Sequence, residues 1–585
     1  MSHCRAFVRR LRRATFAAVL VAAGTVTAHA EVPRVFELAS TSPAGNYLAA
    51  RIAGTARDMA AASAYYRAAL RADPANPELI ERTFIVTVAA GNIDDAAPLA
   101  ERLVLLDKNH RIARLILAAR AIKQNQFAQA RTHLSQAVRG PIADLTATLL
   151  TGWTYYGNNQ FKNGVAAIDR LQGPDWYALF KELHAGLILD LANQRKEALK
   201  RIENARKLDA TNLRTVDAYG RVLSRADRRN DALKVYGEYA KSLSPHPLVQ
   251  AALQELESGK KLAPVVANAQ TGAAEVLFGL GAALARQGGE DLGLVYLQVA
   301  IYLAPEHPLA TVALGDLYET MKRYELAAET YDRVPNSSPL KRNAEIQRAL
   351  NLDVIDKKDE AREKLDALVK ENPKDLTALI AYGNVLRASK KFAEAAVVYS
   401  KIVDLIGEPQ REHWTVFYFR GICYERSKQW ALAEKDFELA LKLMPDEPQV
   451  LNYLGYSWVD QGVNLDRALD MIRKAVALRP KDGYIVDSLG WAYYRLGRLQ
   501  EASDELERAV ELRPDDPTIN DHLGDVYWKT DRKLEATFQW RRAKDLKPEP
   551  EDLSKIEQKL KEGLADDPKP QPAEKTEEKK NPDKG

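Results

Sequence analysis

One short stretch carries the pattern that decides the fold: DSLGWAYYRLGRLQEASDELERAVELRP, residues 487–514. Apolar residues recur in it at helical spacing, and small residues stand at fixed places, Gly490 in the first half and Ala502 in the second. Gly497 separates the two halves, and Pro514 closes the stretch. The pattern predicts two antiparallel helices. Gly490 and Ala502 would mark their close crossing, because larger side chains there would push the helices apart.

The next stretch repeats the pattern. In DHLGDVYWKTDRKLEATFQWRRAKDLKP, residues 521–548, the same roles recur 34 residues later, on Leu523, Gly524, Tyr527, Ala536, Trp540, Ala543 and Pro548. The order W-x2-L-G-x2-Y, then A-x3-F and a proline, is that of the tetratricopeptide repeat (TPR), and the chain resembles this family here. The resemblance implies a stack of helix pairs that binds other proteins.

The same register extends through the C-terminal half. The glycine position recurs, with one alanine, at Gly455, Gly421, Gly383, Ala349, Gly315 and Gly281. Two steps depart from 34 residues, by a four-residue insertion near LIGEPQRE and by one extra residue in QGVNLDRA. This register predicts eight repeats over residues 274–550.

The N-terminal half keeps the period with a weaker pattern. Small residues stand 34 apart at Ala62, Ala96, Ala130, Gly164, Ala198 and Ala232. We predict six degenerate repeats over 43–242, preceded by a lead-in at 31–42. Residues 243–273 break the period and are expected to be a hinge or an irregular spacer.

The repeats predict an all-α fold, a right-handed α-solenoid of about fourteen helix-turn-helix units. A solenoid suits a chain of 585 residues because each repeat buries its faces only against its neighbours. Residues 551–565 are expected to form a capping helix, with Leu553, Ile556 and Leu560 on one face. Residues 566–585 contain prolines and mixed charge but no large apolar side chain, so we expect a disordered tail.

The N-terminal residues resemble an export signal. Five arginines precede the apolar run ATFAAVLVAAGTVTA, and AHA ends at Ala30. This order predicts a signal peptide at 1–30 and a periplasmic protein with no transmembrane segment after cleavage. The alternative is a membrane anchor, for which the run is short. Cys4 does not follow the apolar run as a lipoprotein cysteine would, and Cys423 is expected to be a small packing residue.

The charge balance excludes some partner classes. The formal charge of +4 falls to −1 without the five signal-peptide arginines, so nothing indicates nucleic acid as a partner. The nine histidines show no paired metal-ligand spacing, and G-x-S-x-G is absent. We therefore expect no enzymatic activity, no metal and no cofactor. An enzyme acting on peptidoglycan or another glycan through carboxylates outside any motif stays open as an alternative.

The tetratricopeptide resemblance implies that the first helix of each repeat lines a concave face. The corresponding positions hold candidate residues of a protein-binding groove: Tyr418, Tyr456, Tyr484, Trp491, Tyr494, Arg495 and Trp528. Aromatic rings with polar neighbours suit an extended polypeptide, because they give large contact area at low entropic cost. The alternative is that some of these rings fill gaps between repeats.

A second resemblance covers residues 448–550. The segments LNYLGYSWVDQGVNLDRALDMIRKAVALRPKDGYIVDSLGWAYYRLGRLQEA and HLGDVYWKTDRKLEATFQWRRA are similar to the last repeats of bacterial lipoprotein adaptors of the periplasmic carboxyl-terminal processing protease. This resemblance implies an adaptor or scaffold in the cell envelope that brings cell-wall hydrolases to the protease. Those adaptors carry a lipid, for which this chain has no acceptor cysteine. The alternative function is a periplasmic scaffold for exopolysaccharide or cellulose synthesis and export.

Overall fold

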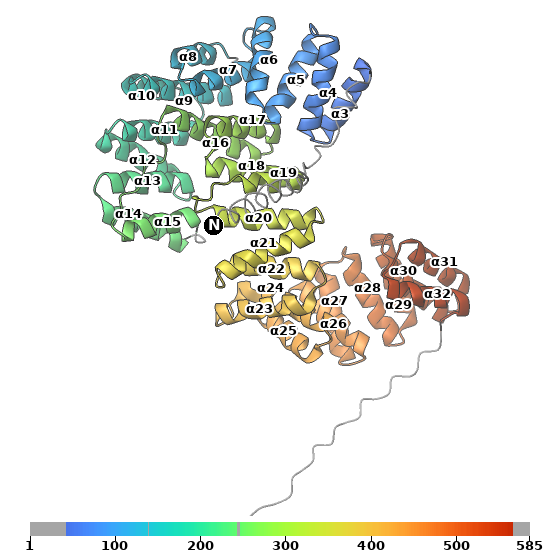
Figure 1. Ribbon diagram of the computed structural model, residues 1–585. Coiled ribbons are helices and arrows are strands. Elements are labelled where there is room, and N and C mark those ends of the chain that lie inside the picture. Colours follow the sequence, from blue (N-terminus) through green and yellow to red (C-terminus); the bar gives the residue numbers. More distant parts are fainter. Residues whose placement is uncertain (1–41, 138–139, 243–245, 565–585) are drawn as a thin grey trace, which may run out of the picture. The chain divides into compact units, whose positions relative to one another are not determined.

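The computed structural model describes residues 42–137, 140–242 and 246–564. The chain forms two compact units, which are described separately: unit 1 ends at Ala361 and unit 2 begins at Arg362 (Figure 1). The predicted signal peptide, the tail at 566–585 and all but the last residue of the lead-in at 31–42 lie outside the described residues.

Unit 1 is built from helix pairs. Six pairs come first: α3 (Pro43–Thr55) with α4 (Met59–Ala72), α5 (Pro77–Ala89) with α6 (Ile93–Leu106), α7 (Arg111–Lys123) with α8 (Phe127–Ser135), α9 (Pro141–Gly157) with α10 (Phe161–Arg170), α11 (Tyr177–Leu191) with α12 (Arg195–Leu208), and α13 (Leu213–Arg225) with α14 (Arg229–Ser242). The single helix α15 (Pro247–Glu257) follows. Next come α16 (Ala269–Arg286) with α17 (Glu290–Leu303), α18 (Pro308–Thr320) with α19 (Tyr324–Asp332), and α20 (Lys341–Val354).

Helix α21 (Lys358–Glu371) crosses the unit boundary, and unit 2 continues the series. It holds α22 (Leu376–Ala388) with α23 (Phe392–Ile406), α24 (Trp414–Arg426) with α25 (Trp430–Leu443), α26 (Pro448–Gln461) with α27 (Leu465–Leu478), α28 (Gly483–Arg495) with α29 (Leu499–Leu512), α30 (Pro517–Lys529) with α31 (Lys533–Asp545), and the last helix α32 (Pro550–Glu562). A short 3₁₀ turn, Arg411–His413, precedes α24. When α20 is counted with α21, which follows it in the chain, the described residues contain fourteen helix pairs. They contain no strand, which confirms the all-α solenoid.

A left-handed residue joins the two helices of every pair. It recurs mostly at 34-residue intervals, at Arg57, Gly91, Asn125, Asn159, Asn193, Asp227, Gly288, Lys322, Asp356, Lys390, Lys428, Gly462, Gly497 and Asp531. Glycine, asparagine and aspartate reach this backbone region most easily, which explains why they dominate the turn. At Gly497 φ is 73°, in accord with the turn expected there.

The close helix crossing also recurs. A Cβ added at Gly490 would lie 2.6 Å from Leu506 Cγ, so only glycine lets α28 approach α29 this closely. Five further glycines face a large ring sixteen residues later: Gly220 on Tyr236, Gly315 on Tyr331, Gly383 on Tyr399, Gly421 on Phe437 and Gly524 on Trp540. Ala502 is fully buried beside the same crossing.

Replacing Gly490 by leucine should overpack the α28–α29 crossing and cost about 1–3 kcal/mol. The free energy of opening of residues 483–545, measured by hydrogen exchange, would report the loss. Gly237→Leu is the matched control, because a Cβ at helical Gly237 meets nothing within 4 Å. Equal effects of the two substitutions would contradict the crossing as the constraint.

In unit 1 the chain packs against its own earlier repeats. Helix α16 contacts α7, α9 and α11, and α17 contacts α5 and α7, as Figure 1 shows. A Cβ at Gly272 of α16 would lie 2.3 Å from the indole of Trp153 on α9, so the two helices touch closely. Four first helices of the N-terminal repeats, α5, α7, α9 and α11, are therefore covered by α16 and α17.

Polar contacts support this packing. Thr146 Oγ1 lies 3.1 Å from the hydroxyl of Tyr296, although the residues are 150 apart in sequence. Gln270 Nε2 donates to the Lys123 carbonyl at 2.7 Å, and the Tyr302 hydroxyl donates to Asp94 at 2.6 Å. The buried apolar residues of these helices form one continuous core.

The segment 243–273 contains more structure than an irregular spacer. It holds α15, an irregular run at 258–268 and the first residues of α16. Helix α15 packs against α13 and α14, and the backbone N–H of Leu262 donates to Ser224 Oγ at 3.0 Å. This segment therefore lies within unit 1, whereas the contacts divide the chain inside α21. The array boundaries expected from the sequence stay a prediction.

Trp153→Ala should loosen the N-terminal repeats together with α16 and α17. Trp153 is fully buried between these elements, and removing such a ring costs about 3–5 kcal/mol. Hydrogen exchange should increase in α9, α11 and α16 at once, while residues 376–545 keep their protection. Trp176→Ala, at a ring that is 45% exposed, is the control. Unchanged protection of α16 in the Trp153 variant would contradict the shared core.

Candidate binding surface

The first helices α26, α28 and α30 carry a shared surface in unit 2. We call it the first-helix face and define it by Asn452, Tyr456, Asp460, Tyr484, Asp487, Trp491, Arg495, Asp521, Asp525 and Trp528. Helix α28 contacts both α26 and α30. Side chains connect neighbouring helices along it: Arg495 Nη1 donates to the Asp460 carbonyl at 3.2 Å.

Two of the seven predicted groove residues are buried in the chain's own packing. Tyr418 is 8% exposed, and its ring centroid lies 6.0 Å from that of Tyr453 and 6.2 Å from that of Phe437. Tyr494 is also 8% exposed and stacks on Trp491. These rings fill gaps between helices, as the alternative interpretation of the sequence allowed.

Tyr484 is the most exposed of the predicted aromatic residues, at 49%. Arg513 lies 4.8 Å from its ring centroid, and Arg513 Nη2 donates to its hydroxyl at 2.8 Å. Arg479 and Lys481 line the same shallow hollow of about 590 Å³. This end of the face therefore offers an aromatic ring among three cations.

Trp491 lies at the centre of the face. Its ring centroid is 4.9 Å from that of Tyr494 and 4.1 Å from that of His522, and it is stacked with both. Tyr456 is half-buried nearby, and burial, with the carboxylates of Asp487 and Asp460, raises the pKa of its hydroxyl.

Trp528 closes the other end of the face. Its ring centroid lies 5.2 Å from that of Trp540, and Lys533 Nζ lies 4.0 Å from the centroid. A Cβ at Gly563, which follows α32, would meet the Trp528 ring at 2.1 Å. Part of this ring is therefore covered by the chain that leaves the last helix.

Sequence reasoning missed a buried ionic cluster beside these rings. His522 Nδ1 lies 2.9 Å from Asp487, and Lys559 Nζ of α32 lies 2.8 Å from both Asp521 and Asp525. The 34-residue spacing of Asp487 and Asp521 was visible in the sequence, but it does not reveal that α32 supplies a lysine to Asp521 and Asp525. The cluster ties α28, α30 and α32 together.

Three consecutive first helices carry buried polar atoms that have no partner among the described residues. The atoms are Asn452 Oδ1 on α26, Trp491 Nε1 on α28, and Asn520 Oδ1 and Asp521 Oδ1 on α30. A buried polar atom without a hydrogen bond costs about 1–3 kcal/mol. Three of them, on Asn452, Trp491 and Asp521, belong to the first-helix face and are shielded from solvent, so a ligand with donors and acceptors would pair with them only after neighbouring side chains move.

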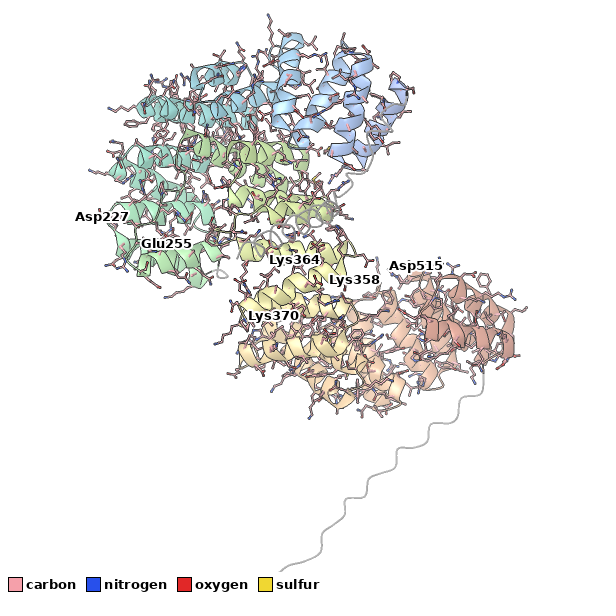
Figure 2. All side chains as sticks on the ribbon, viewed as in Figure 1. Asp227, Glu255, Lys358, Lys364, Lys370 and Asp515 are labelled. Atoms are coloured by element: carbon pink, nitrogen blue, oxygen red, sulfur yellow. The ribbon has the colours of Figure 1, made fainter. Side chains whose placement is uncertain are left out.

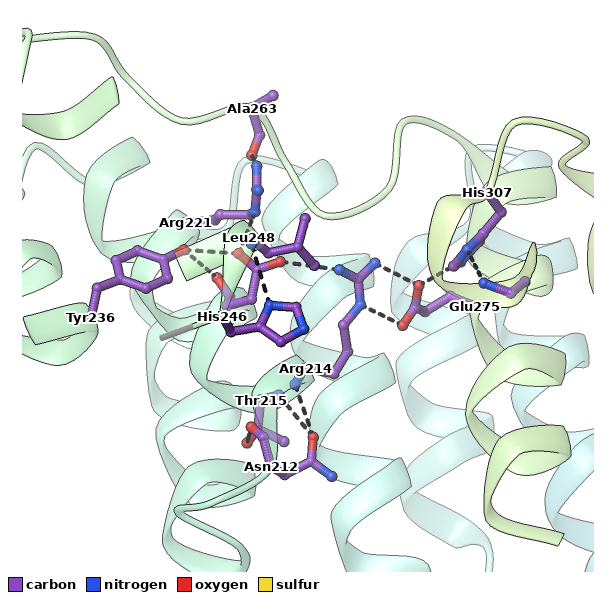
Figure 3. Close-up of polar contacts among 12 residues, drawn as sticks. Asn212, Arg214, Thr215, Arg221, Tyr236, His246, Leu248, Ala263, Glu275 and His307 are labelled. Atoms are coloured by element: carbon purple, nitrogen blue, oxygen red, sulfur yellow. Dashed lines mark hydrogen bonds and ion pairs between the residues drawn. The ribbon is translucent and has the colours of Figure 1, made fainter. Parts of the chain in front are cut away.

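Unit 1 holds a second ionic cluster, at the junction of α13, α16 and α18 (Figure 3). Arg214 binds both oxygens of Glu275 at 2.6 Å, and His307 Nε2 lies 3.1 Å from the same carboxylate. Asp217 pairs with Arg214 and with Arg221, and it accepts from Tyr236 at 2.9 Å. These groups neutralise one another, so the cluster joins α13 to α16 and α18 as a packing element. It borders a hollow of about 690 Å³.

Chemistry for catalysis is not evident in the described ranges. Within them, no group of three His, Cys, Asp or Glu side chains is placed to hold a metal ion. Cys423 is fully buried, and burial raises the pKa of its thiol to about 12, so it packs rather than reacts. None of the described helices combines the length and apolar character that crossing a bilayer requires.

Comparisons with known families match this geometry. Sequence models described as TPR repeat or tetratricopeptide repeat match residues 44–76, 311–334, 347–408 and 490–531. The protein is a tetratricopeptide repeat protein. Such repeats imply a protein–protein interaction scaffold, and no catalytic family is indicated.

Relatives of this tetratricopeptide repeat protein share only part of it. The TPR repeat-containing protein PA4667 of Pseudomonas aeruginosa is 36% identical over 91 residues, which cover 16% of this chain and 15% of that protein. The crystal structure of the APC/C heterotetramer Cut9–Hcn1 is 16% identical, with a TM-score of 0.37 over 91% of this chain and 98% of that one. A tetratricopeptide repeat protein from Parabacteroides merdae is 15% identical, with a TM-score of 0.34 over 48% and 96%.

Exposure separates packing rings from surface rings in this tetratricopeptide repeat protein. Tyr494→Ala should cost about 3 kcal/mol, since it removes a buried ring of α28 that stacks on Trp491. Tyr484→Ala should change stability by less than about 0.5 kcal/mol, because the ring is half exposed. Denaturant unfolding of both variants measures the difference. Similar losses in the two would contradict the burial assigned here.

Proposed function

We propose that the protein is an exported, non-enzymatic adaptor that binds an extended polypeptide on the first-helix face of unit 2. The observation that carries this proposal is the series of buried, unpartnered polar atoms on α26, α28 and α30. A polypeptide backbone offers a donor and an acceptor at each residue, so it can pair with Asn452 Oδ1, Trp491 Nε1 and Asp521 Oδ1 in turn once the side chains that shield these atoms move aside.

The spacing of the face supports an extended ligand. Packed helices lie about 8–10 Å apart, and an extended chain rises about 3.3 Å per residue, so about three residues span one repeat. An extended segment would therefore meet one unpartnered atom per repeat. Tyr484 and the rings around Trp491 supply apolar contact beside these hydrogen bonds.

The proposed location of this adaptor rests on the sequence. The signal peptide expected at 1–30 supports export to the periplasm, with Glu31 as the mature N-terminus. The resemblance of residues 448–550 to protease adaptors supports a processing protease and cell-wall hydrolases as partners. Edman sequencing or mass spectrometry of the purified chain tests the first point, and a retained Met1 or an attached lipid would contradict it.

Replacing Trp491 by phenylalanine tests the face directly. The substitution keeps an aromatic ring but removes an N–H that has no partner among the described residues, so the unfolding free energy should change by less than about 1 kcal/mol. Partner binding should weaken about two- to tenfold, the equivalent of one hydrogen bond. The measurement is capture from a cell-envelope extract by the mature chain, followed by affinity measurement with the recovered partner.

Trp458→Phe is the matched control. Trp458 is fully buried, its Nε1 donates to Glu434 at 2.6 Å, and neither residue belongs to the first-helix face, so this variant should lose about 1–3 kcal/mol of stability and keep its affinity. Unchanged binding by the Trp491 variant would contradict the proposed site. Recovery of a protease with cell-wall hydrolases supports the protease adaptor, whereas recovery of exopolysaccharide export components supports the alternative scaffold.

A further inference from the structure

A buried ionisable cluster holds the last repeat of unit 2 against its neighbours. His522 of α30 pairs with Asp487 of α28, with 7% and 6% of these residues exposed. Lys559 of α32 pairs with Asp521 and Asp525 of α30 at 2.8 Å. One lysine therefore serves two carboxylates, one of which is almost fully buried.

Other elements add groups to this cluster. Trp540 of α31 donates to Asp525 Oδ1, and the Trp491 ring of α28 stacks on His522 at 4.1 Å. The carboxylates of Asp487 and of Asp552 on α32 both act electrostatically on the hydroxyl of Tyr456 on α26. Hydrogen bonds and ion pairs of the cluster therefore connect α28, α30, α31 and α32 beside the centre of the first-helix face.

Besides Lys559, two groups of the cluster have raised pKa values. Burial and the neighbouring Asp521 raise the pKa of Asp525 to about 6, although Lys559 and His522 oppose the shift. Burial alone would lower the pKa of His522, but Asp487, assisted by Asp521 and Asp525, outweighs it and raises this pKa.

The sign of both shifts is the same. A group with a raised pKa binds its proton more tightly in the folded chain than in the unfolded chain, so protonation stabilises the fold. For both groups, folding stability is greatest at low pH and falls as the pH rises through the folded pKa. Glu501 and Glu507 of α29 and Glu557 of α32 have lowered pKa values and so stay ionised between pH 5 and 8.

We propose that the last repeat of unit 2 is a proton-sensitive element. The cluster of His522, Asp487, Asp525 and Lys559 holds α30 against α28 and α32 in mildly acidic solution and loosens as the solution becomes alkaline. Terminal repeats open locally, since each repeat is held only by its neighbours. Loosening separates the Trp491 ring from the His522 ring on which it stacks. The pH therefore controls how rigidly the side chains at this end of the first-helix face are held. The inference holds whether or not the face binds a polypeptide.

The test is hydrogen exchange of the full chain at pH 5 and pH 8, corrected for the intrinsic effect of pH on exchange. For Asp525 alone, the pKa is about 6 in the folded chain and has its ordinary value of 3.8 in the opened chain. This difference raises the equilibrium constant for opening about tenfold from pH 5 to pH 8. We expect at least this increase in residues 517–562. Residues 448–478 serve as the internal reference and should change little. Equal opening at both pH values, or greater opening at pH 5, would overturn the proposal.

Asp525→Asn removes the buried charge. The difference between pH 5 and pH 8 in residues 517–562 should become smaller than in the wild-type chain, because only His522 still titrates. Asp515→Asn is the control: this side chain is 73% exposed on the outside of unit 2 (Figure 2), and the variant should keep the wild-type difference. His522→Gln, measured in the same way, should also reduce the difference, and it provides a second test if Asp525→Asn does not fold. A full pH difference retained in a folded Asp525→Asn or His522→Gln chain would contradict the mechanism.

Discussion

The close crossing of two helices within each repeat is the constraint on which the structure depends. Gly490 admits the side chain of Leu506, and the same geometry recurs where Gly524 faces Trp540 and Gly220 faces Tyr236. Because the crossing fixes the angle and distance of each pair, successive pairs can stack with the same 34-residue period. The left-handed residue in each turn within a pair, such as Gly497 or Asn193, reverses the direction of the chain, so that the second helix can pack against the first.

The first helices of the repeats have different surroundings in the two units of this chain. In unit 1, α16 and α17 pack on the first helices of the N-terminal repeats, and Trp153 is fully buried against Gly272. In unit 2, α28 keeps Tyr484 half exposed and leaves Trp491 Nε1 without a partner among the described residues. A repeat whose first helices are already covered by its own chain has no room for a ligand there. The proposed adaptor function therefore lies with unit 2.

Local spacing predicted the repeats because it determines local packing. The positions of Gly490 and Ala502 were sufficient to place a crossing, and Gly497 to place a turn. Contacts between distant repeats do not produce a regular spacing in the sequence. Thr146 and Tyr296 are in contact although they are 150 residues apart, and neither belongs to the repeat pattern. The covering of the unit 1 first helices by α16 and α17 could therefore not be read from the sequence.

The candidate site was predictable in outline but not in detail. Repeat positions correctly placed Tyr484 and Trp491 on first helices, but position alone could not separate Tyr484 from the buried Tyr494, since a ring's exposure depends on the size of its neighbours on adjacent helices. The partnership of Lys559 with Asp521 was also hidden, because it depends on how α32 packs after the last repeat. Whether the seven predicted residues bind a protein stays a prediction.

The central claim is that the first helices are covered in unit 1 and open in unit 2. Hydroxyl-radical footprinting of the full chain, read by mass spectrometry, tests it most directly. The account predicts that Trp153, which is fully buried, resists oxidation, while Trp176 in the same unit and Tyr484 in unit 2, exposed by 45% and 49%, are oxidised. Oxidation of Trp153 as rapid as that of Trp176 would show that α16 does not cover α9 and would contradict the account.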